Sequence, residues 1–232
     1  MAPKNQSRKS PSDGAMKLIL AAEKLFGEHG IEGVSLRQII NAAGLVNSYS
    51  IHHHFGSKEG LVQAVFDNRV PAFEEACRAR LDAEKAGQGE LTLRGLLAAR
   101  FMPLVECFDE QTRQSYSRFL LRLLYRSEAV HPYLRSEVPQ PAINEVYNRL
   151  RNHFADLPNA VFISRFRFAS DMFFGAIVEQ RRLKRQAPEL YQSDADYWNE
   201  ILEIIEHVFH VPYRGQPAAP LTGVDRGTEP LG

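Results

Sequence analysis

Apolar residues recur every three to four positions along most of this 232-residue chain. Such spacing places apolar side chains on one face of an α-helix, whereas a half-buried strand alternates apolar and polar residues. No alternating stretch of convincing length occurs, so we predict an all-α fold. Residues 1–14 and 212–232 are rich in Lys, Ser, Pro, Gly and Thr. Because these segments cannot bury enough apolar surface to order themselves, we expect a flexible basic arm and a flexible tail.

Glycines and capping residues divide the first 60 positions into three short helices. We predict these helices at about residues 16–29, 35–43 and 48–55. The second starts in Ser35-Leu36-Arg37-Gln38, a capping box in which two side chains each satisfy a backbone group. The third has only two turns and needs its neighbours for stability.

Prolines and glycines divide the rest of the chain into longer helices. One starts after a cap at Ser57, must bend near Pro71, and is followed by a Gly87-Gln88-Gly89 loop. Further helices are predicted at about residues 92–108, with Pro103 as a kink, and at 111–128, 140–156, 159–185 and 194–210. We therefore expect a three-helix domain at residues 15–60 and a larger helical domain at 61–211.

Composition is typical of a soluble globular protein. The chain is 44% hydrophobic and 24% charged, and its 28 basic and 28 acidic residues cancel. No apolar stretch is long enough to span a membrane, and the start of the chain lacks a signal-peptide region, so we expect a cytoplasmic protein that does not bind a membrane. Cys77 and Cys107 lie far apart without a partner motif, so no disulfide framework, thiolate zinc site or cofactor is predicted.

The first 60 residues contain a motif that points to DNA. Three helices in about 40 residues, with a glycine in the turn between the second and third, match a helix-turn-helix, whose last helix enters the major groove. The strings ILAAEKLF (19–26), VSLRQI (34–39), AAGL (42–45) and HHFGSKEGL (53–61) resemble the DNA-binding domain of the tetracycline-repressor (TetR) family of bacterial transcription regulators. The resemblance covers about 45 residues. It implies a homodimer, an operator DNA with two-fold symmetry and a small-molecule inducer.

Candidate DNA contacts lie near the starts of the second, third and fourth helices. They are Ser35, Arg37, Asn47, Ser48, Tyr49, Ser50, His52, His53 and Lys58. We expect the residues at helix starts to hold phosphates and the first four residues of the recognition helix to read base edges. His52 and Tyr49 depart from the family pattern, which usually has Tyr and often Gly there. No relative's operator sequence can therefore be transferred to this chain.

A second set of candidates is mostly aromatic and lies in the larger domain. Ligand cavities are largely apolar and contain a few polar groups that orient the ligand. The residues expected to line such a cavity are Phe101, Met102, Phe108, Tyr116, Phe119, Leu120, Leu123, Tyr147 and Phe166. Each can instead be ordinary core. We predict a repressor that a small apolar or aromatic ligand releases from DNA, through movement of the helix at residues 58–85.

The helices at 159–185 and 194–210 carry apolar residues on more than one side. We interpret them as a four-helix dimer interface, with an intramolecular core as the alternative. The candidate interface residues are Phe173, Gly175, Ala176, Trp198, Ile201, Ile205 and Phe209.

Metal sites and enzyme activity are not predicted. His52-His53-His54 cannot converge on one ion, because successive helical residues point about 100° apart. Glu203, His207 and His210 are better spaced, but histidines in a last helical turn usually complement the helix dipole. No phosphate-loop lysine motif, G-x-S-x-G or H-E-x-x-H occurs. Near-neutral charge and the unusual recognition helix keep one alternative open, a helical small-molecule-binding or interaction protein without DNA binding.

Overall fold

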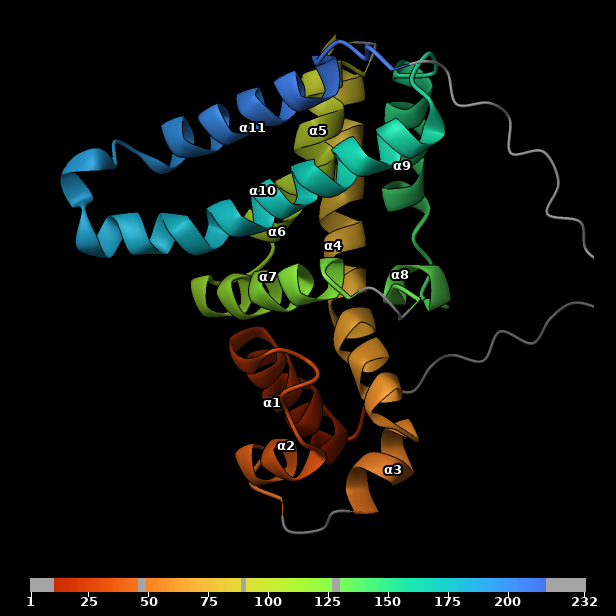
Figure 1. Ribbon diagram of the computed structural model, residues 1–232, viewed down its shortest axis with the longest axis vertical. Coiled ribbons are helices and arrows are strands. Elements are labelled where there is room, and N and C mark those ends of the chain that lie inside the picture. The colour runs from red at the N-terminus through yellow and green to blue at the C-terminus, as the bar shows by residue number, and fades with distance from the viewer. Residues whose placement is uncertain (1–10, 46–48, 89–90, 127–129, 216–232) are drawn as a thin grey trace, which may run out of the picture.

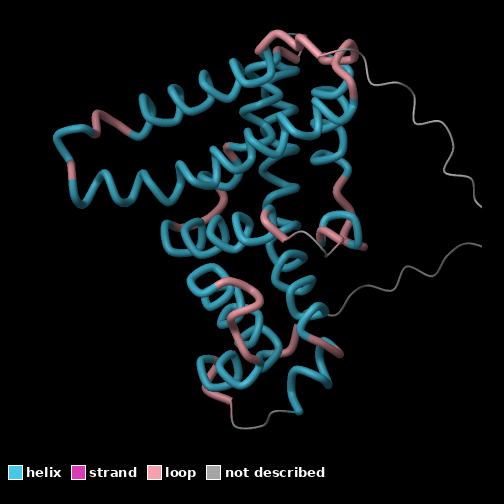
Figure 2. The backbone as a smooth tube through the Cα atoms, viewed as in Figure 1, coloured by secondary structure: helices cyan, strands magenta, loops and turns pink. Residues whose placement is uncertain are grey.

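The computed structural model describes residues 11–45, 49–88, 91–126 and 130–215. Every regular element among them is a helix, which confirms the predicted all-α fold (Figures 1 and 2). In chain order the elements are α1 (Asp13–His29), α2 (Leu36–Ala42), α3 (Tyr49–Phe55), α4 (Lys58–Gln88), α5 (Leu93–Phe101), α6 (Pro103–Glu106), α7 (Glu110–Leu124), α8 (Pro132–Arg135), α9 (Pro141–His153), α10 (Asn159–Gln186), the 3-10 helix η1 (Pro188–Leu190) and α11 (Asp194–His210). None of the described helices is long and apolar enough to cross a membrane.

The elements differ from the predicted ones most clearly at α4, at α5 and α6, and at α8 and η1. α4 runs to Gln88, so Gly87 lies in its last turn and not in a loop. The helix predicted at 92–108 is two helices, because Pro103 has no N–H to continue α5 and starts α6 instead. α8 and η1 have four and three residues, too few for an apolar repeat to predict them.

α4 connects the two parts of the molecule. It continues through Pro71, and Figure 1 shows its part next to α3 inclined to its upper part. α1 and α3 pack near its beginning, while α5, α8 and α9 pack along the rest. Phe26, Ile39 and Ile51 belong to the core between the first four helices, and each is fully enclosed. The short helices α2 and α3 therefore depend on α1 and α4 for their stability.

α1 is held against the larger domain by close packing and by a buried ion pair. A Cβ atom at Gly27 would lie 3.0 Å from the Ser115 carbonyl oxygen, so glycine lets α7 approach α1 closely. Glu23 is 2% exposed and accepts hydrogen bonds from Arg69 of α4 at 2.8 and 3.2 Å. The Ser115 hydroxyl of α7 donates to the same carboxylate. Because an unpaired buried carboxylate is costly, these bonds fix α1 relative to α4 and α7.

α9 is anchored on α4 by two carboxylates. Glu74 accepts hydrogen bonds from two backbone N–H groups at the start of α9. Glu145 of α9 accepts hydrogen bonds from Arg78 and Lys85 of α4. Burial alone would raise the pKa of Glu145. The hydrogen bonds from these two cations and from Arg149 together outweigh that effect and lower the pKa to about 2. Glu145 is therefore ionised near neutral pH and holds the two helices together.

α10 and α11 form an antiparallel pair that extends beyond the rest of the molecule (Figure 1). Arg165 of α10 is 9% exposed, and its guanidinium donates hydrogen bonds to the carbonyl oxygens of Phe209 and Val211. These bonds satisfy carbonyls at the end of α11 that have no partner within the helix. The buried charge of Arg165 thus joins the two helices.

The same helix pair contains the residues that were predicted to form a dimer interface. Five of the seven predicted side chains are at most 7% exposed within the single chain. These buried residues are Phe173, Ala176, Trp198, Ile205 and Phe209. They pack on the chain's own core, which favours the alternative interpretation of these positions, an intramolecular core. Gly175 and Ile201 are partly exposed, and Phe168 and Ile204, at 65% and 39% exposure, lie on the outer side.

Candidate nucleic-acid interface and ligand cavity

The predicted capping box is present at the start of α2. The Ser35 hydroxyl oxygen accepts a hydrogen bond from the Gln38 backbone N–H at 3.3 Å, and the Gln38 side-chain oxygen accepts from the Ser35 N–H at 2.8 Å. Ser35 and Arg37 are both exposed. The two candidate phosphate contacts are therefore accessible beside the start of α2.

α3 presents histidines to solvent and one isoleucine to the core. Ile51 is fully enclosed, whereas His52, His53 and His54 are exposed. His52 Nδ1 lies 3.0 Å from the Gly56 carbonyl oxygen and, in the tautomer with hydrogen on Nδ1, donates to it. The rings of His53 and His54 meet edge to face, with centroids 4.9 Å apart. In the described part of the chain, no group of three His, Cys, Asp or Glu side chains could hold a metal ion.

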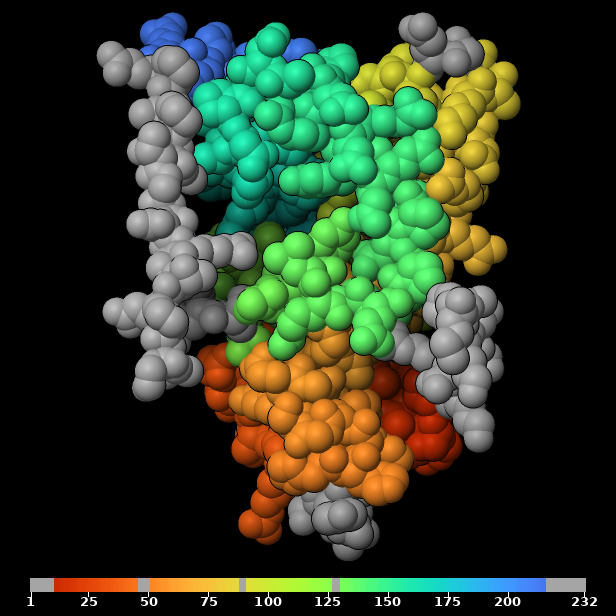
Figure 3. Space-filling view, turned by 90° about the vertical axis from the view of Figure 1, so that its right-hand side faces the viewer, coloured from red at the N-terminus to blue at the C-terminus, as the bar shows by residue number. Residues whose placement is uncertain are grey.

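The base-reading candidates precede these histidines. Asn47 and Ser48 lie outside the described residues, and so do the side chains of Tyr49 and Ser50, whose backbone begins α3. Figure 3 shows the orange segment, which includes α3 and the first part of α4, at one end of the molecule. α3 thus lies at the end of the molecule opposite α11 (Figure 1).

Close contacts set the position of α3 on α4. A Cβ atom at Gly60 would lie 1.9 Å from the Phe55 carbonyl oxygen, so no larger residue fits unless α3 moves. Lys58, at the start of α4, is half-buried, and its ammonium donates to the Glu32 carbonyl oxygen at 3.4 Å. Lys58 therefore contacts the turn between α1 and α2 in addition to being a candidate phosphate contact.

A cavity of about 590 Å³ lies in the larger domain, between α4, α5, α6, α7, α8, α9 and α10. This volume falls in the usual range for small-molecule sites. Five of the nine predicted residues line it, namely Tyr116, Leu120, Leu123, Tyr147 and Phe166. The other four, Phe101, Met102, Phe108 and Phe119, pack in the core around it. The structure therefore brings together only part of the predicted set.

The cavity is also lined by arginine and histidine side chains that were not predicted from the sequence. Arg100, Arg126, Arg167 and His131 line it, and its described lining contains no Asp or Glu. Burial, together with the charges of Arg167 and Arg100, lowers the pKa of His131 to about 4. The imidazole is therefore neutral near pH 7. Helical periodicity gave no signal for these residues, because a charged residue on an amphipathic helix normally faces solvent.

Arg126 connects this cavity to the N-terminal helices. Its guanidinium donates to Glu32 at 2.7 and 3.1 Å and to Glu59 at 2.7 and 3.0 Å. The hydrogen bond from Arg126 is the main reason that the pKa of Glu59 is below its ordinary value. Arg135 of α8 lies 3.9 Å from the same carboxylate. A residue that lines the cavity thus also holds the α1–α2 turn and the first turn of α4.

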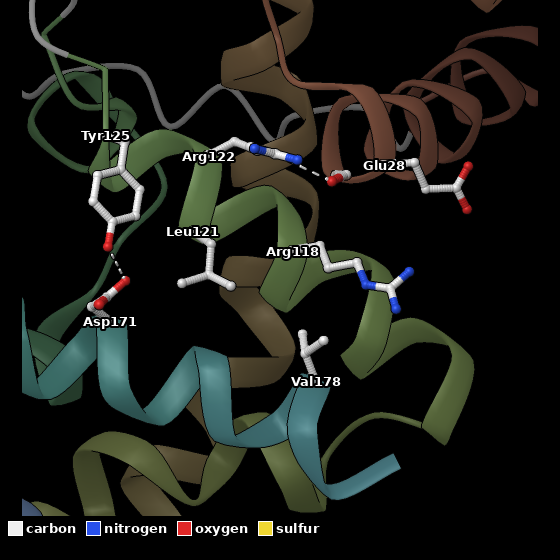
Figure 4. A pocket seen from close by; sticks show the side chains of 8 residues that line it. Glu28, Arg118, Leu121, Arg122, Tyr125, Asp171 and Val178 are labelled. Carbon is white, nitrogen blue, oxygen red and sulfur yellow. Dashed lines mark hydrogen bonds between the residues drawn. The ribbon is translucent and has the colours of Figure 1, made fainter. Parts of the chain in front are cut away.

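A second hollow of about 520 Å³ lies between α1, α7 and α10 (Figure 4). Arg122 donates to the Gly27 carbonyl oxygen there, and the Tyr125 hydroxyl donates to Asp171 at 2.7 Å. Its lining is more polar, and several of its polar groups already have protein partners. The first cavity is therefore the better candidate for an apolar ligand.

The first four helices define a helix-turn-helix domain, with α2 and α3 as the two helices of the motif. Residues 18–65 match the family model described as bacterial regulatory proteins, tetR family. The N-terminal part of this chain is therefore a TetR-family domain, as the sequence strings predicted.

Named relatives match limited parts of the chain. The HTH-type transcriptional repressor ComR of Escherichia coli is 32% identical over 90 residues, which are 39% of this chain and 40% of ComR. The HTH-type transcriptional regulatory protein RaaS of Mycobacterium tuberculosis is 55% identical over 47 residues, 20% of this chain and 21% of RaaS. The chain thus spans less than half the length of the curated relatives that it matches. The fatty acid degradation regulator FadR of Bacillus halodurans has a solved structure that matches with a TM-score of 0.47 at 18% identity, covering 87% of this chain and 95% of that one.

Gly60→Ala tests how closely α3 must approach α4. We expect the free energy of unfolding to fall by about 1–3 kcal/mol, because the methyl group would overlap the Phe55 carbonyl oxygen. Gly87→Ala in the same helix is the matched control, since a Cβ atom there meets no atom within 4 Å. It should leave stability unchanged or raise it by up to about 1 kcal/mol. Equal stability of the two variants in urea unfolding would contradict the geometry described for α3.

Proposed function

We propose that this protein is a DNA-binding transcription regulator of the TetR type, and specifically a repressor that a ligand releases from its operator. The observation that carries the proposal is the matched region 18–65, folded as a helix-turn-helix with α3 at one end of the molecule. Relatives named as transcriptional repressors, ComR among them, favour repression over activation.

In this proposal each group of candidate residues has a distinct task on DNA. Ser35, Arg37 and Lys58 hold phosphates on either side of the major groove, and His52 and His53 add contacts from the exposed side of α3. Asn47, Ser48, Tyr49 and Ser50 read base edges at the start of the recognition helix. The near-zero net charge of the chain does not exclude this, because only the charges facing DNA determine the contact.

Release from DNA begins in the 590 Å³ cavity. A ligand acts only if it binds the DNA-free arrangement better than the DNA-bound one. Arg126 provides the connection, because it lines the cavity and holds Glu32 and Glu59 of the N-terminal helices. A ligand that draws Arg126 inward, or displaces it, changes how the α1–α2 turn and the start of α4 are held.

The homodimer forms through the outer faces of α10 and α11. Residues with exposed or partly exposed side chains on these faces include Phe168, Met172, Ile201 and Ile204. Gly175 lies among them, and a Cβ atom there would meet nothing within 4 Å, so a partner helix can approach its backbone. Two copies of α3 in one dimer would match an operator with two-fold symmetry.

DNA binding is tested with a fragment from upstream of the protein's own gene, by fluorescence anisotropy over a series of salt concentrations. We expect sequence-preferring binding that weakens steeply with salt, since neutralised phosphates release counterions. Arg37→Gln should weaken binding to all sequences and reduce the salt slope by about 1, whereas Tyr49→Ala should relax sequence preference. Arg185→Gln, an exposed arginine at the far end of α10, should bind like the wild type. Lack of any sequence preference at low salt would contradict the proposed function.

Phe168→Glu and Phe173→Ala separate the dimer surface from the core of α10. Phe168→Glu should give a folded monomer in light scattering, because it places a charge on the outer face. Phe173→Ala should lower the free energy of unfolding by about 3–5 kcal/mol, because the phenyl ring is fully enclosed in the chain. A dimeric Phe168→Glu variant would move the interface elsewhere. Dissociation of a fully stable Phe173→Ala variant would return Phe173 to the interface.

A further inference from the structure

The guanidinium of Arg100 is the least compensated charge in the cavity. In the described part of the chain no carbonyl, hydroxyl or carboxylate oxygen accepts a hydrogen bond from it, and no carboxylate lies within ion-pair distance of it. Instead it lies among three phenyl rings, with Cζ 5.6 Å from the centroid of Phe73, 5.4 Å from Phe101 and 5.2 Å from Phe166. The rings hold the cation by cation–π attraction and leave its N–H groups without acceptors.

Other arginines of the chain show how a guanidinium inside or beside the core is normally satisfied. Arg165 donates to two carbonyl oxygens, and Arg69 donates to the carboxylate of Glu23. The two other arginines of the cavity also have acceptors, since Arg126 pairs with two carboxylates and Arg167 donates to a backbone carbonyl oxygen. Arg100 differs from all of these. It lines the cavity, and no described protein group accepts a hydrogen bond from its five N–H donors.

The electrostatic environment of Arg100 agrees with this geometry. Burial lowers the pKa of the Arg100 guanidinium, and the groups that act in the opposite direction are the Cys77 thiol and the phenols of Tyr133 and Tyr116, none of them a carboxylate. The nearby His131 supplies no counter-ion, and it adds no further positive charge because its imidazole is neutral near pH 7. Arg100 is partly exposed and lines the cavity, and a cation that is partly removed from water without a counter-ion is costly, so an anion that enters the cavity gains a favourable interaction with it.

We propose that the cavity binds an organic carboxylate with an apolar body, and that its carboxylate pairs with the Arg100 guanidinium. This inference rests on the proposed role of the cavity as the ligand site and adds the charge of the ligand. The planar fork of an arginine fits a carboxylate with two parallel hydrogen bonds. The apolar body would contact the aliphatic and aromatic lining, to which Phe66, Leu120 and Ile143 belong. Tyr147, whose ring packs on Phe166, also lines the cavity.

The experiment compares acids with neutral compounds of the same shape. Decanoate is matched with decan-1-ol, and 2-naphthoate with 2-naphthylmethanol, and binding to the full-length protein is measured by isothermal titration calorimetry without DNA. We expect at least one acid to bind about 10- to 100-fold more tightly than its alcohol, which is the usual effect of hydrogen bonds to a charged group. Equal affinity within both pairs, or no binding of either acid, would overturn the proposal.

Variants of Arg100 locate the effect. Arg100→Gln should remove the preference for the acid while retaining the affinity for the alcohol, which also shows that the cavity remains folded. Arg100→Lys keeps the positive charge but loses the planar guanidinium that can make two parallel hydrogen bonds, so it should retain part of the preference for the acid. The matched control is Arg151→Gln, because Arg151 also stacks on a ring, that of Phe162, but its N–H groups already donate to carbonyl oxygens outside the cavity. An undiminished preference in Arg100→Gln would place the anion elsewhere and contradict the proposal.

DNA binding is measured separately, so that the two proposals can fail independently. An Arg100-dependent preference for acids in a protein that does not bind DNA would support the carboxylate site and contradict the regulator function. Release of operator DNA by acid and alcohol alike, unaffected by Arg100→Gln, would support the regulator and contradict the carboxylate site.

Discussion

The guanidinium of Arg126 is the link on which this account of the molecule depends. It lines the cavity and makes paired hydrogen bonds to Glu32 and Glu59. Glu32 lies in the turn that leads into α2, and Glu59 lies in the first turn of α4, against which α3 packs. The cavity and the helix-turn-helix are therefore not independent. Any ligand that changes the position or the solvation of Arg126 also changes how the elements around α3 are held.

Besides the close packing of α1 on α7, two sets of ion pairs of different strength hold the N-terminal domain to the rest of the chain. The pair between Glu23 and Arg69 is buried, and breaking such a pair leaves an uncompensated charge, so it acts as a fixed point. The pairs of Arg126 include the exposed Glu32 and the partly exposed Glu59, and ion pairs of this kind contribute little to stability. A domain held in this way can change its orientation at the weaker attachment while the stronger one stays intact.

Most of the helices and the capping box were predictable from the sequence. Which part of the chain, or which other molecule, covers each apolar face was not. The capping box at Ser35 and the short third helix follow from spacing alone, and so does the all-α fold. Phe173 was assigned to a dimer interface because a repeat shows that a face is apolar, and it does not show which chain covers that face. Arg100 was missed for a related reason. Its cavity is formed by segments far apart in the sequence, and nothing near Arg100 in the chain predicts that its guanidinium lines a cavity without an acceptor.

Amide hydrogen exchange of Arg126→Gln tests the central claim most directly. If Arg126 joins the cavity to the helix-turn-helix, exchange should become faster both in the α1–α2 turn and start of α4 and in the cavity segment at residues 130–135. Arg135→Gln is the matched control, since Arg135 lies 3.9 Å from Glu59 and makes no contact with Glu32, and it should have a smaller effect at the α1–α2 turn. Unchanged exchange at the N-terminal helices in Arg126→Gln, or a change confined to the cavity, would contradict the account.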